Sequence, residues 1–267
     1  MSELFRSFQP TLTKSGLSHF GLSLESSLPC PSLRGVVHSY LQIKSDKPTP
    51  YPIIPDGTLA IFISPNGSFI GGTQIKSCAV QILEAGEYFG IRFYAGGLRH
   101  FFNLDLAEIT GKFVDHHYLP CSHLGSLHQQ IYTKNRYLAR VEICESWLMR
   151  SYQAKPLNSF DQALSLIYQS SGGMKINQLA DKVGWSSRHL NRLFRFNTGI
   201  NTKTFSKIIR MQTACKQLYN NPSQSLLNSE LDLGFFDQSH LIKEFKHHLN
   251  SKPTTFLNRF MSDFYNQ

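Results

Sequence analysis

The sequence of 267 residues has five cysteines and no C-x-x-C pair, so neither a paired-cysteine zinc site nor a dense disulfide framework is expected. No window approaches 18 uncharged apolar residues, so we expect no membrane span. The first residues, Met-Ser-Glu-Leu-Phe-Arg, lack the apolar core of a signal peptide, so a cytoplasmic protein is expected. The apolar fraction of 41% is enough for one large or two ordinary domains.

The motifs of common enzyme classes are also missing. The sequence has no Walker loop, no Gly-x-Ser-x-Gly, and no His-x-His of the kind that begins many metal sites in β-barrels. One group of acidic and histidine residues is close in sequence, but its spacing fits no recurring ligand set. Its members are Asp115, His116, His117, His123 and His128. We therefore expect no enzyme, no metal and no cofactor.

Acidic residues are the scarcer charged class, 18 against 27 basic residues, and the net charge is +9. The excess lies toward the C-terminus, where residues 156–267 hold 13 basic and 7 acidic side chains. Between residues 175 and 216 there are nine basic residues and one acid, Asp181. Such a concentration of positive charge is typical of a phosphate-binding surface, although a solvated basic surface has the same composition.

The sequence predicts an α+β multidomain protein whose first domain, residues 1–152, is rich in β-structure. Strands are predicted at 36–43, 58–63, 68–70, 80–83 and 88–93, with turn signals such as Pro-Asp-Gly and Pro-Asn-Gly between them. Many short, evenly spaced strands predict a small β-barrel or sandwich.

A single long helix is predicted over residues 124–152, where apolar residues follow a heptad spacing. The apolar stripe has two interpretations: it packs on its own domain, or it pairs with a second copy of the chain. Antiparallel pairing would place Lys134 opposite Glu145 of the partner subunit, so that the two charges neutralise each other. The residues of this predicted dimer seam are Ile131, Lys134, Leu138, Val141, Glu145 and Leu148.

After a predicted linker at 153–159, one pattern occurs twice in a predicted all-α domain at 160–267. Each copy has a glycine, an aromatic residue, a polar helix start, and a helix with leucine and phenylalanine on one face. Leu190 and Phe194 in the first copy correspond to Leu241 and Phe245 in the second. The repeat indicates two helix-turn-helix modules, at 176–196 and 226–249, joined by a helix at 203–219.

The outward faces of the second helices are predicted to read DNA. Arginine pairs with guanine and asparagine with adenine in the major groove, and the other cations reach phosphates. In the first module the predicted contacts are Arg188, His189, Asn191, Arg192 and Arg195. In the second module, after the helix cap Asp237, they are Gln238, Ser239, His240 and Lys243.

These modules resemble the AraC/XylS family of bacterial transcription regulators. The matching residues of the first half are Leu179, Ala180, Gly184, Ser186, Leu190, Arg192, Phe194, Gly199 and Arg210. Those of the second half are Gly234, Phe235, Asp237, Gln238, Ser239, His240, Phe245, Lys246, Pro253 and Phe256. The resemblance implies base contacts from Arg188, Asn191, Arg192, Gln238, Ser239 and Lys243.

The sequence departs from the family pattern at three places. Thr202 stands where the family usually has proline, and Asn250 replaces a usual glycine. Ser229 and Glu230 take the place of an apolar residue and an alanine where the helices of the second module cross. We therefore expect the first module to dominate specificity and the second to add affinity and register.

Residues 51–57 and 90–96 resemble the cupin-like sensor domains that precede such C-terminal domains and are often followed by a dimer helix. The resemblance implies an activator that binds a double-stranded promoter operator as a homodimer, contacts RNA polymerase and responds to a small-molecule effector. Lys44, Arg92 and Arg99 are candidates to meet an anionic effector, although each is more often a surface charge. The alternatives are a cupin-type metalloenzyme fused to a DNA-binding module, and a ligand-independent regulator controlled by a protein partner.

Overall fold

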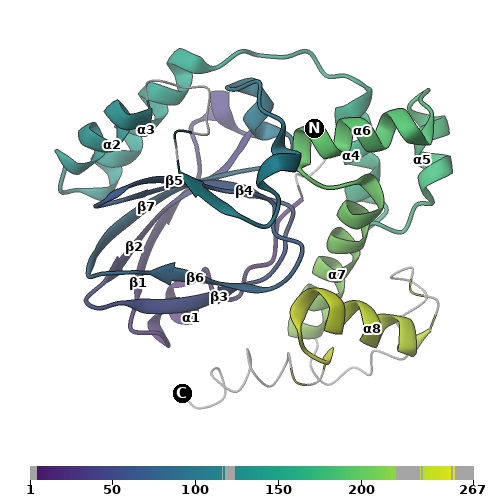
Figure 1. Ribbon diagram of the computed structural model, residues 1–267, viewed down its shortest axis with the longest axis horizontal. Helices are drawn as coiled ribbons and strands as arrows, with labels where there is room; N and C mark the ends of the chain where they lie inside the picture. The colour runs from purple at the N-terminus through teal and green to yellow at the C-terminus, as the bar shows by residue number, and fades with distance from the viewer. Residues whose placement is uncertain are drawn as a thin grey trace.

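A computed structural model describes residues 5–115, 117, 124–220, 235, 237–253 and 255 of the chain. A β-rich half is followed by a helical half that lies beside it (Figure 1). The strands are β1 (Ser23–Ser27), β2 (Val37–Ser45), β3 (Thr49–Ile53), β4 (Leu59–Ser64), β5 (Gly67–Gly71), β6 (Cys78–Ile82), β7 (Gly86–Phe93) and β8 (Phe113–Asp115). The helices are α1 (Lys14–Ser18), η1 (Pro31–Leu33), η2 (Gly97–His100), η3 (Leu106–Ile109), α2 (Leu124–Tyr132), α3 (Tyr137–Ser151), α4 (Ser159–Gln169), α5 (Ile176–Lys182), α6 (Ser187–Thr198), α7 (Thr202–Asn220) and α8 (Gln238–Leu249). The predicted order of a β-rich domain and an α-helical domain is confirmed.

All strand pairs are antiparallel and fall into two sheets. Six strands follow the order β1-β2-β7-β4-β5-β8, and β3 pairs with β6 separately. Within the described residues no strand pairing joins the two sheets, so the domain is an open sandwich of unequal layers. All five predicted strands are present, within a few residues of their predicted ends.

Strand β3 was not predicted, because its sequence Thr-Pro-Tyr-Pro-Ile contains two prolines. Pro50 and Pro52 occupy alternate positions, so their missing N–H groups face the same open edge. The backbone N–H groups of Thr49, Tyr51 and Ile53 alternate with them and point toward β6, where Tyr51 lies opposite Val80. Proline on an unpaired edge is compatible with a strand that pairs on one side only.

Alternate residues of the six-stranded sheet supply two separate apolar cores. On one face, Tyr40, Ile61 and Ile91 pack with α2 and α3. On the opposite face, Leu41 and Ile43 pack with α1 and the β3–β6 pair. The period of two in these strands therefore places helices on one side of the sheet and the small sheet on the other.

The predicted helix over 124–152 is wrong in one respect, because it is two helices. α2 ends at Tyr132, and the hydroxyl of Thr133 donates to the Gln130 carbonyl at 2.7 Å. Arg140, only 3% exposed, reaches back from α3 and donates from Nε to the Lys134 carbonyl at 2.7 Å. Its Nη1 lies 2.7 Å from Glu87 Oε2 on β7. The heptad pattern continues through the turn at 133–136 and therefore does not reveal it.

Most of the predicted dimer seam is directed toward the chain's own sheet. Ile131, Val141 and Leu148 are buried in the core that the chain forms with its own sheet. Glu145 Oε1 accepts from the Cys30 backbone N–H at 2.6 Å, and it is not free to pair with Lys134 of a second copy. Leu138 is 60% exposed and Lys134 is exposed. The interpretation that fits is packing on the same domain, and dimerisation itself stays a prediction.

The two halves of the chain share cores and hydrogen bonds. Ile54 of the β-rich half is buried among side chains of α7 and α8, and Ala95 is buried among those of α4 to α7. The guanidinium of Arg99 lies 2.5 Å from Asp161 on α4 and over the ring of Phe160. The helical half is therefore docked against the sheet domain, and α7 runs along the boundary (Figure 1).

Candidate nucleic-acid interface

The first module has the geometry of a helix-turn-helix. Gly184 has a φ of +71° in the turn between α5 and α6, and the Ser186 hydroxyl accepts from the His189 N–H at 3.2 Å to cap α6. Leu190 and Phe194 are fully buried, and Ala180 of α5 is 2% exposed. These residues hold α6 so that its other face points away from the core.

The outward face of α6 is strongly basic. Arg188, Arg192 and Arg195 are exposed and line a groove together with Lys203 of α7. Four cations on one surface create the positive potential that attracts the DNA backbone, and arginines on a helix reach base edges. Lys203 was not among the predicted contacts, although it belongs to the basic run at 175–216 that pointed to this surface.

Three predicted contacts already have partners within the chain. The Asn191 side-chain oxygen accepts from the Thr202 backbone N–H at 3.1 Å. Arg192 Nη2 donates to His189 Nδ1 at 3.3 Å, and the His189 ring lies edge-on to Trp185. To pair with adenine through both amide atoms, Asn191 has to turn its side-chain oxygen away from the Thr202 N–H.

The bond from Thr202 to Asn191 explains the departure from proline at position 202. Thr202 is the first residue of α7, where a backbone N–H has no partner inside the helix. Proline has no N–H to satisfy at this position, whereas threonine does. Asn191 supplies the missing acceptor and so ties the start of α7 to the middle of α6.

The described part of the second module consists mainly of α8. Asp237 caps the helix by accepting from the His240 N–H at 2.7 Å, and Asn250 ends it with a φ of +53°. Leu241, Phe245 and Leu249 are buried, as predicted. Gln238, Ser239 and Lys243 are exposed, whereas His240 is half-buried against Phe235. Ser229 and Glu230 lie outside the described residues.

A buried carboxylate fixes α8 on α7. Glu244 is 7% exposed and accepts from Lys207 Nζ of α7 at 2.6 Å. Burial alone raises a carboxyl pKa, but the bonds from His248 and Lys207 outweigh it and lower the pKa of Glu244 to about 2. Lys207 therefore serves to hold the second module and is not a free cation for DNA.

The sheet domain touches the end of α6. The Thr110 hydroxyl donates to the Gly199 carbonyl at 2.6 Å, and the Thr73 hydroxyl donates to the Thr198 carbonyl at 2.6 Å. Asp105 and Ala107 of the sheet domain line the same groove as the arginines of α6. An acidic residue beside the basic face competes with DNA phosphates for it. No local pattern in the sequence predicts these two hydrogen bonds, because they join residues 89 and 125 positions apart.

The three candidate effector cations differ in their surroundings. Arg92 is 7% exposed and pairs with the buried carboxylate of Asp56, and Arg99 pairs with Asp161. Lys44 is exposed on β2. Arg92 and hydrogen bonds from Thr58 and Gln9 outweigh burial and hold the pKa of Asp56 below its usual value. Arg92 and Arg99 therefore have their charges balanced within the chain, which does not favour an anionic effector at either one.

The described residues contain no group of three or more His, Cys, Asp or Glu side chains placed to hold a metal ion. His116 and His123 lie outside that part of the chain. Likewise, no described helix has the length and apolar character needed to cross a membrane.

The fold and the basic face define a class of protein: a helix-turn-helix DNA-binding regulator with an attached β-rich domain. A family model described as a helix-turn-helix domain matches residues 179–259, and a domain of unknown function (DUF6597) matches residues 25–115. The probable transcription factor PqrA of Proteus vulgaris is 33% identical over 88 residues, 33% of this chain and 71% of that protein. The chain belongs to the AraC/XylS family of transcription regulators.

Other matches have lower sequence identity. The Msm operon regulatory protein of Streptococcus mutans is 27% identical over 97 residues, which is 36% of this chain but only 34% of that protein. The structure of ToxT from Vibrio cholerae bound to an unsaturated fatty acid aligns with 86% of this chain and 97% of that one. The identity with ToxT is 11% and the TM-score is 0.44.

Proposed function

We propose that the chain binds a specific promoter operator chiefly through α6, and that its β-rich domain controls this binding. Residues 160–267 would form the DNA-binding unit and residues 1–152 the regulatory unit. The observation that carries the proposal is the groove where Arg188, Arg192, Arg195 and Lys203 converge on one exposed surface. On α8, Gln238, Ser239 and Lys243 are the exposed candidates for a second contact, with His240 partly engaged.

Selection of duplexes from a random pool by the full-length protein tests this function. The selected duplex should bind about a thousandfold or more tightly than a scrambled duplex of equal composition. If four to six phosphates are neutralised, a plot of the logarithm of the binding constant against the logarithm of the salt concentration should have a slope of about −4 to −5. Equal affinity for the selected and scrambled duplexes at every salt concentration would remove sequence-specific binding from the proposal.

Control by the β-rich domain is supported by the contacts at the end of α6. With Thr73 and Thr110 bonded to the carbonyls of Thr198 and Gly199, Asp105 is held beside the reading face. This docked arrangement lowers the fraction of molecules that can enter a major groove. An effector or a protein partner that releases the contact would raise the apparent affinity for DNA without touching α6.

The double variant Thr73→Val/Thr110→Val removes both hydroxyl donors and keeps the side-chain shapes. We expect its apparent affinity for the selected duplex to rise about five- to thirtyfold, because two hydrogen bonds that favour docking are lost. Fluorescence anisotropy titration at fixed salt measures this. The control is Thr133→Val, because the Thr133 hydroxyl donates only to a nearby carbonyl, that of Gln130 at the end of α2. Unchanged affinity of the double variant, with the control also unchanged, would show that docking does not oppose DNA binding.

We further propose that the protein activates transcription through contact with RNA polymerase, acts as a homodimer and works in the cytoplasm. The relatives named as transcription factor and operon regulator support regulation of transcription. On α3, Leu138 and Met149 are 60% and 43% exposed although the helix packs on its own sheet. These two apolar side chains of α3 are therefore available for self-association. Sedimentation of the purified protein with and without DNA tests the dimer.

A further inference from the structure

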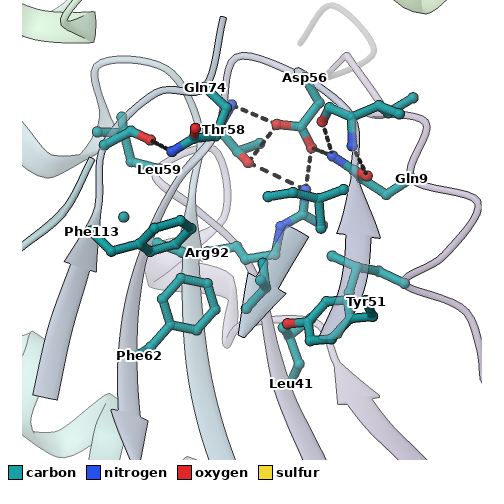
Figure 2. A pocket seen from close by; sticks show the side chains of 17 residues that line it. Gln9, Leu41, Tyr51, Asp56, Thr58, Leu59, Phe62, Gln74, Arg92 and Phe113 are labelled. Carbon is teal, nitrogen blue, oxygen red and sulfur yellow. Dashed lines mark hydrogen bonds and ion pairs between the residues drawn. The ribbon is translucent and has the colours of Figure 1, made fainter. Parts of the chain in front are cut away.

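A cavity lies between the six-stranded sheet and the β3–β6 pair. Its outer chamber has a volume of about 310 Å³, and a smaller inner chamber of about 50 Å³ adjoins it. Figure 2 shows the side chains that line the inner chamber. Both chambers are lined by Leu41, Tyr51, Phe62, Val80 and Phe113, so the two chambers lie side by side. The outer chamber alone reaches the lower end of the range typical of small-molecule sites.

The outer chamber is mainly apolar and opens on apolar side chains, although Asn66, Gln81 and Glu84 also line it. Ile43 and Ile82 are buried in its wall, whereas Leu83 and Phe113 line it and are 76% and 42% exposed. Large exposed apolar side chains at a cavity entrance lower the free energy of the complex when a ligand covers them. The body of a fitting ligand is therefore apolar.

The inner chamber is polar but has no uncompensated charge. Arg92 and Asp56 both line it and form a buried ion pair, to which the Thr58 hydroxyl adds a bond with Asp56 Oδ1 at 2.7 Å. No lysine lines either chamber in the described part of the chain. A carboxylate placed here would bring a second anion against the single cation, which desolvation makes unfavourable.

One hydroxyl in the cavity has no partner in the described residues. Tyr51 is 2% exposed and lines both chambers, and its phenolic oxygen forms no hydrogen bond with the part of the chain that the structure describes. Figure 2 shows this oxygen pointing from β3 toward the side of the cavity where Phe62 lies. Burial raises the pKa of Tyr51, so its hydroxyl stays neutral and able to donate a hydrogen bond. A buried tyrosine hydroxyl normally has a partner, and a ligand can supply it.

We propose that this cavity binds an uncharged, mainly apolar molecule with one hydroxyl or carbonyl group that pairs with Tyr51. The proposal rests on the proposed control by the β-rich domain and names the class of its effector. The segment 54–58 connects the cavity to the helices: Asp56 and Thr58 line the inner chamber, and Gln212 Nε2 of α7 donates to the Pro55 carbonyl at 2.7 Å. A ligand that shifts Asp56 therefore shifts a contact of α7.

The test compares two probes with the same chain, 1-decanol and decanoate, titrated calorimetrically into the full-length protein without DNA. We expect decanol to bind at least tenfold more tightly than decanoate at pH 7.5. Tyr51→Phe should weaken decanol binding about five- to tenfold, since it removes only the hydroxyl. Tyr88→Phe is the matched control, because Tyr88 also lines the cavity but already donates to the Glu84 carbonyl at 2.8 Å.

A second variant locates the site. Val80→Trp fills the shared part of the cavity and should abolish decanol binding, while circular dichroism verifies the fold. Equal or tighter binding of decanoate would overturn the neutral-ligand assignment, and decanol binding that survives Val80→Trp would overturn the location. Because these titrations contain no DNA, either failure is separate from failure of the operator selection. A saturating decanol concentration that leaves DNA affinity unchanged would overturn the connection to α7.

Discussion

Asp56→Ala should destabilise the protein by about 3–5 kcal/mol, because it leaves the Arg92 guanidinium buried without its counter-charge. Arg92 is 7% exposed, and its other neighbours, Ser7 and Thr58, offer only neutral hydroxyl oxygens at 3.2 and 3.3 Å. Urea denaturation followed by circular dichroism measures the loss. The effect is large because the remaining charge is almost entirely buried.

The double variant Asp56→Ala/Arg92→Met distinguishes the pair from the individual residues. Removing both charges should restore much of the stability lost in the single variant, since an uncompensated buried charge is no longer present. As a control, Glu142→Ala removes an exposed carboxylate of α3 and should change stability by less than about 0.5 kcal/mol. A single variant as stable as the wild type would mean that Arg92 finds solvent or another anion.

Arg192→Ala should weaken binding to the selected duplex by about 1–3 kcal/mol, which is about five- to 150-fold. Arg192 is exposed at the centre of the α6 face, and its guanidinium lies 3.3 Å from the His189 ring nitrogen and forms no ion pair within the described residues. Anisotropy titrations at one salt concentration, repeated with duplexes altered at each position, measure both affinity and selectivity. The loss should be concentrated at one base pair.

Arg150→Ala is the matched control for charge, because it removes one exposed cation from α3 in the other half of the chain. It should leave affinity within about twofold. If Arg192→Ala weakens all duplexes equally, Arg192 contacts phosphate and does not read bases. No change at all would exclude it from the interface.

The sequence predicted the elements whose signals are local. The cap Asp237, the buried positions Leu190 and Phe194, and the extent of α7 were all evident from spacing and residue type. A helix cap and an apolar stripe involve residues a few positions apart, so their physical causes lie within the segment itself.

The features that sequence could not predict depend on distant partners. The break between α2 and α3 depends on Arg140 reaching Glu87 and Gln42, and the role of Asn191 depends on Thr202. The cavity likewise needs two sheets that only the tertiary fold brings together. A pattern along the chain shows that a residue is polar, but it does not show which group that residue will meet.

Two glycines at the boundary between the halves limit how relatives of this protein can diverge. A Cβ atom on Gly96 would lie 2.6 Å from the Phe160 ring, and one on Gly57 would lie 2.9 Å from the Phe205 ring. Both glycines have positive φ, so each position resists a side chain for reasons of space and of backbone conformation. A descendant that acquires side chains at both positions must hold its DNA-reading half differently, and these two sites therefore mark which lineages have kept this arrangement of domains.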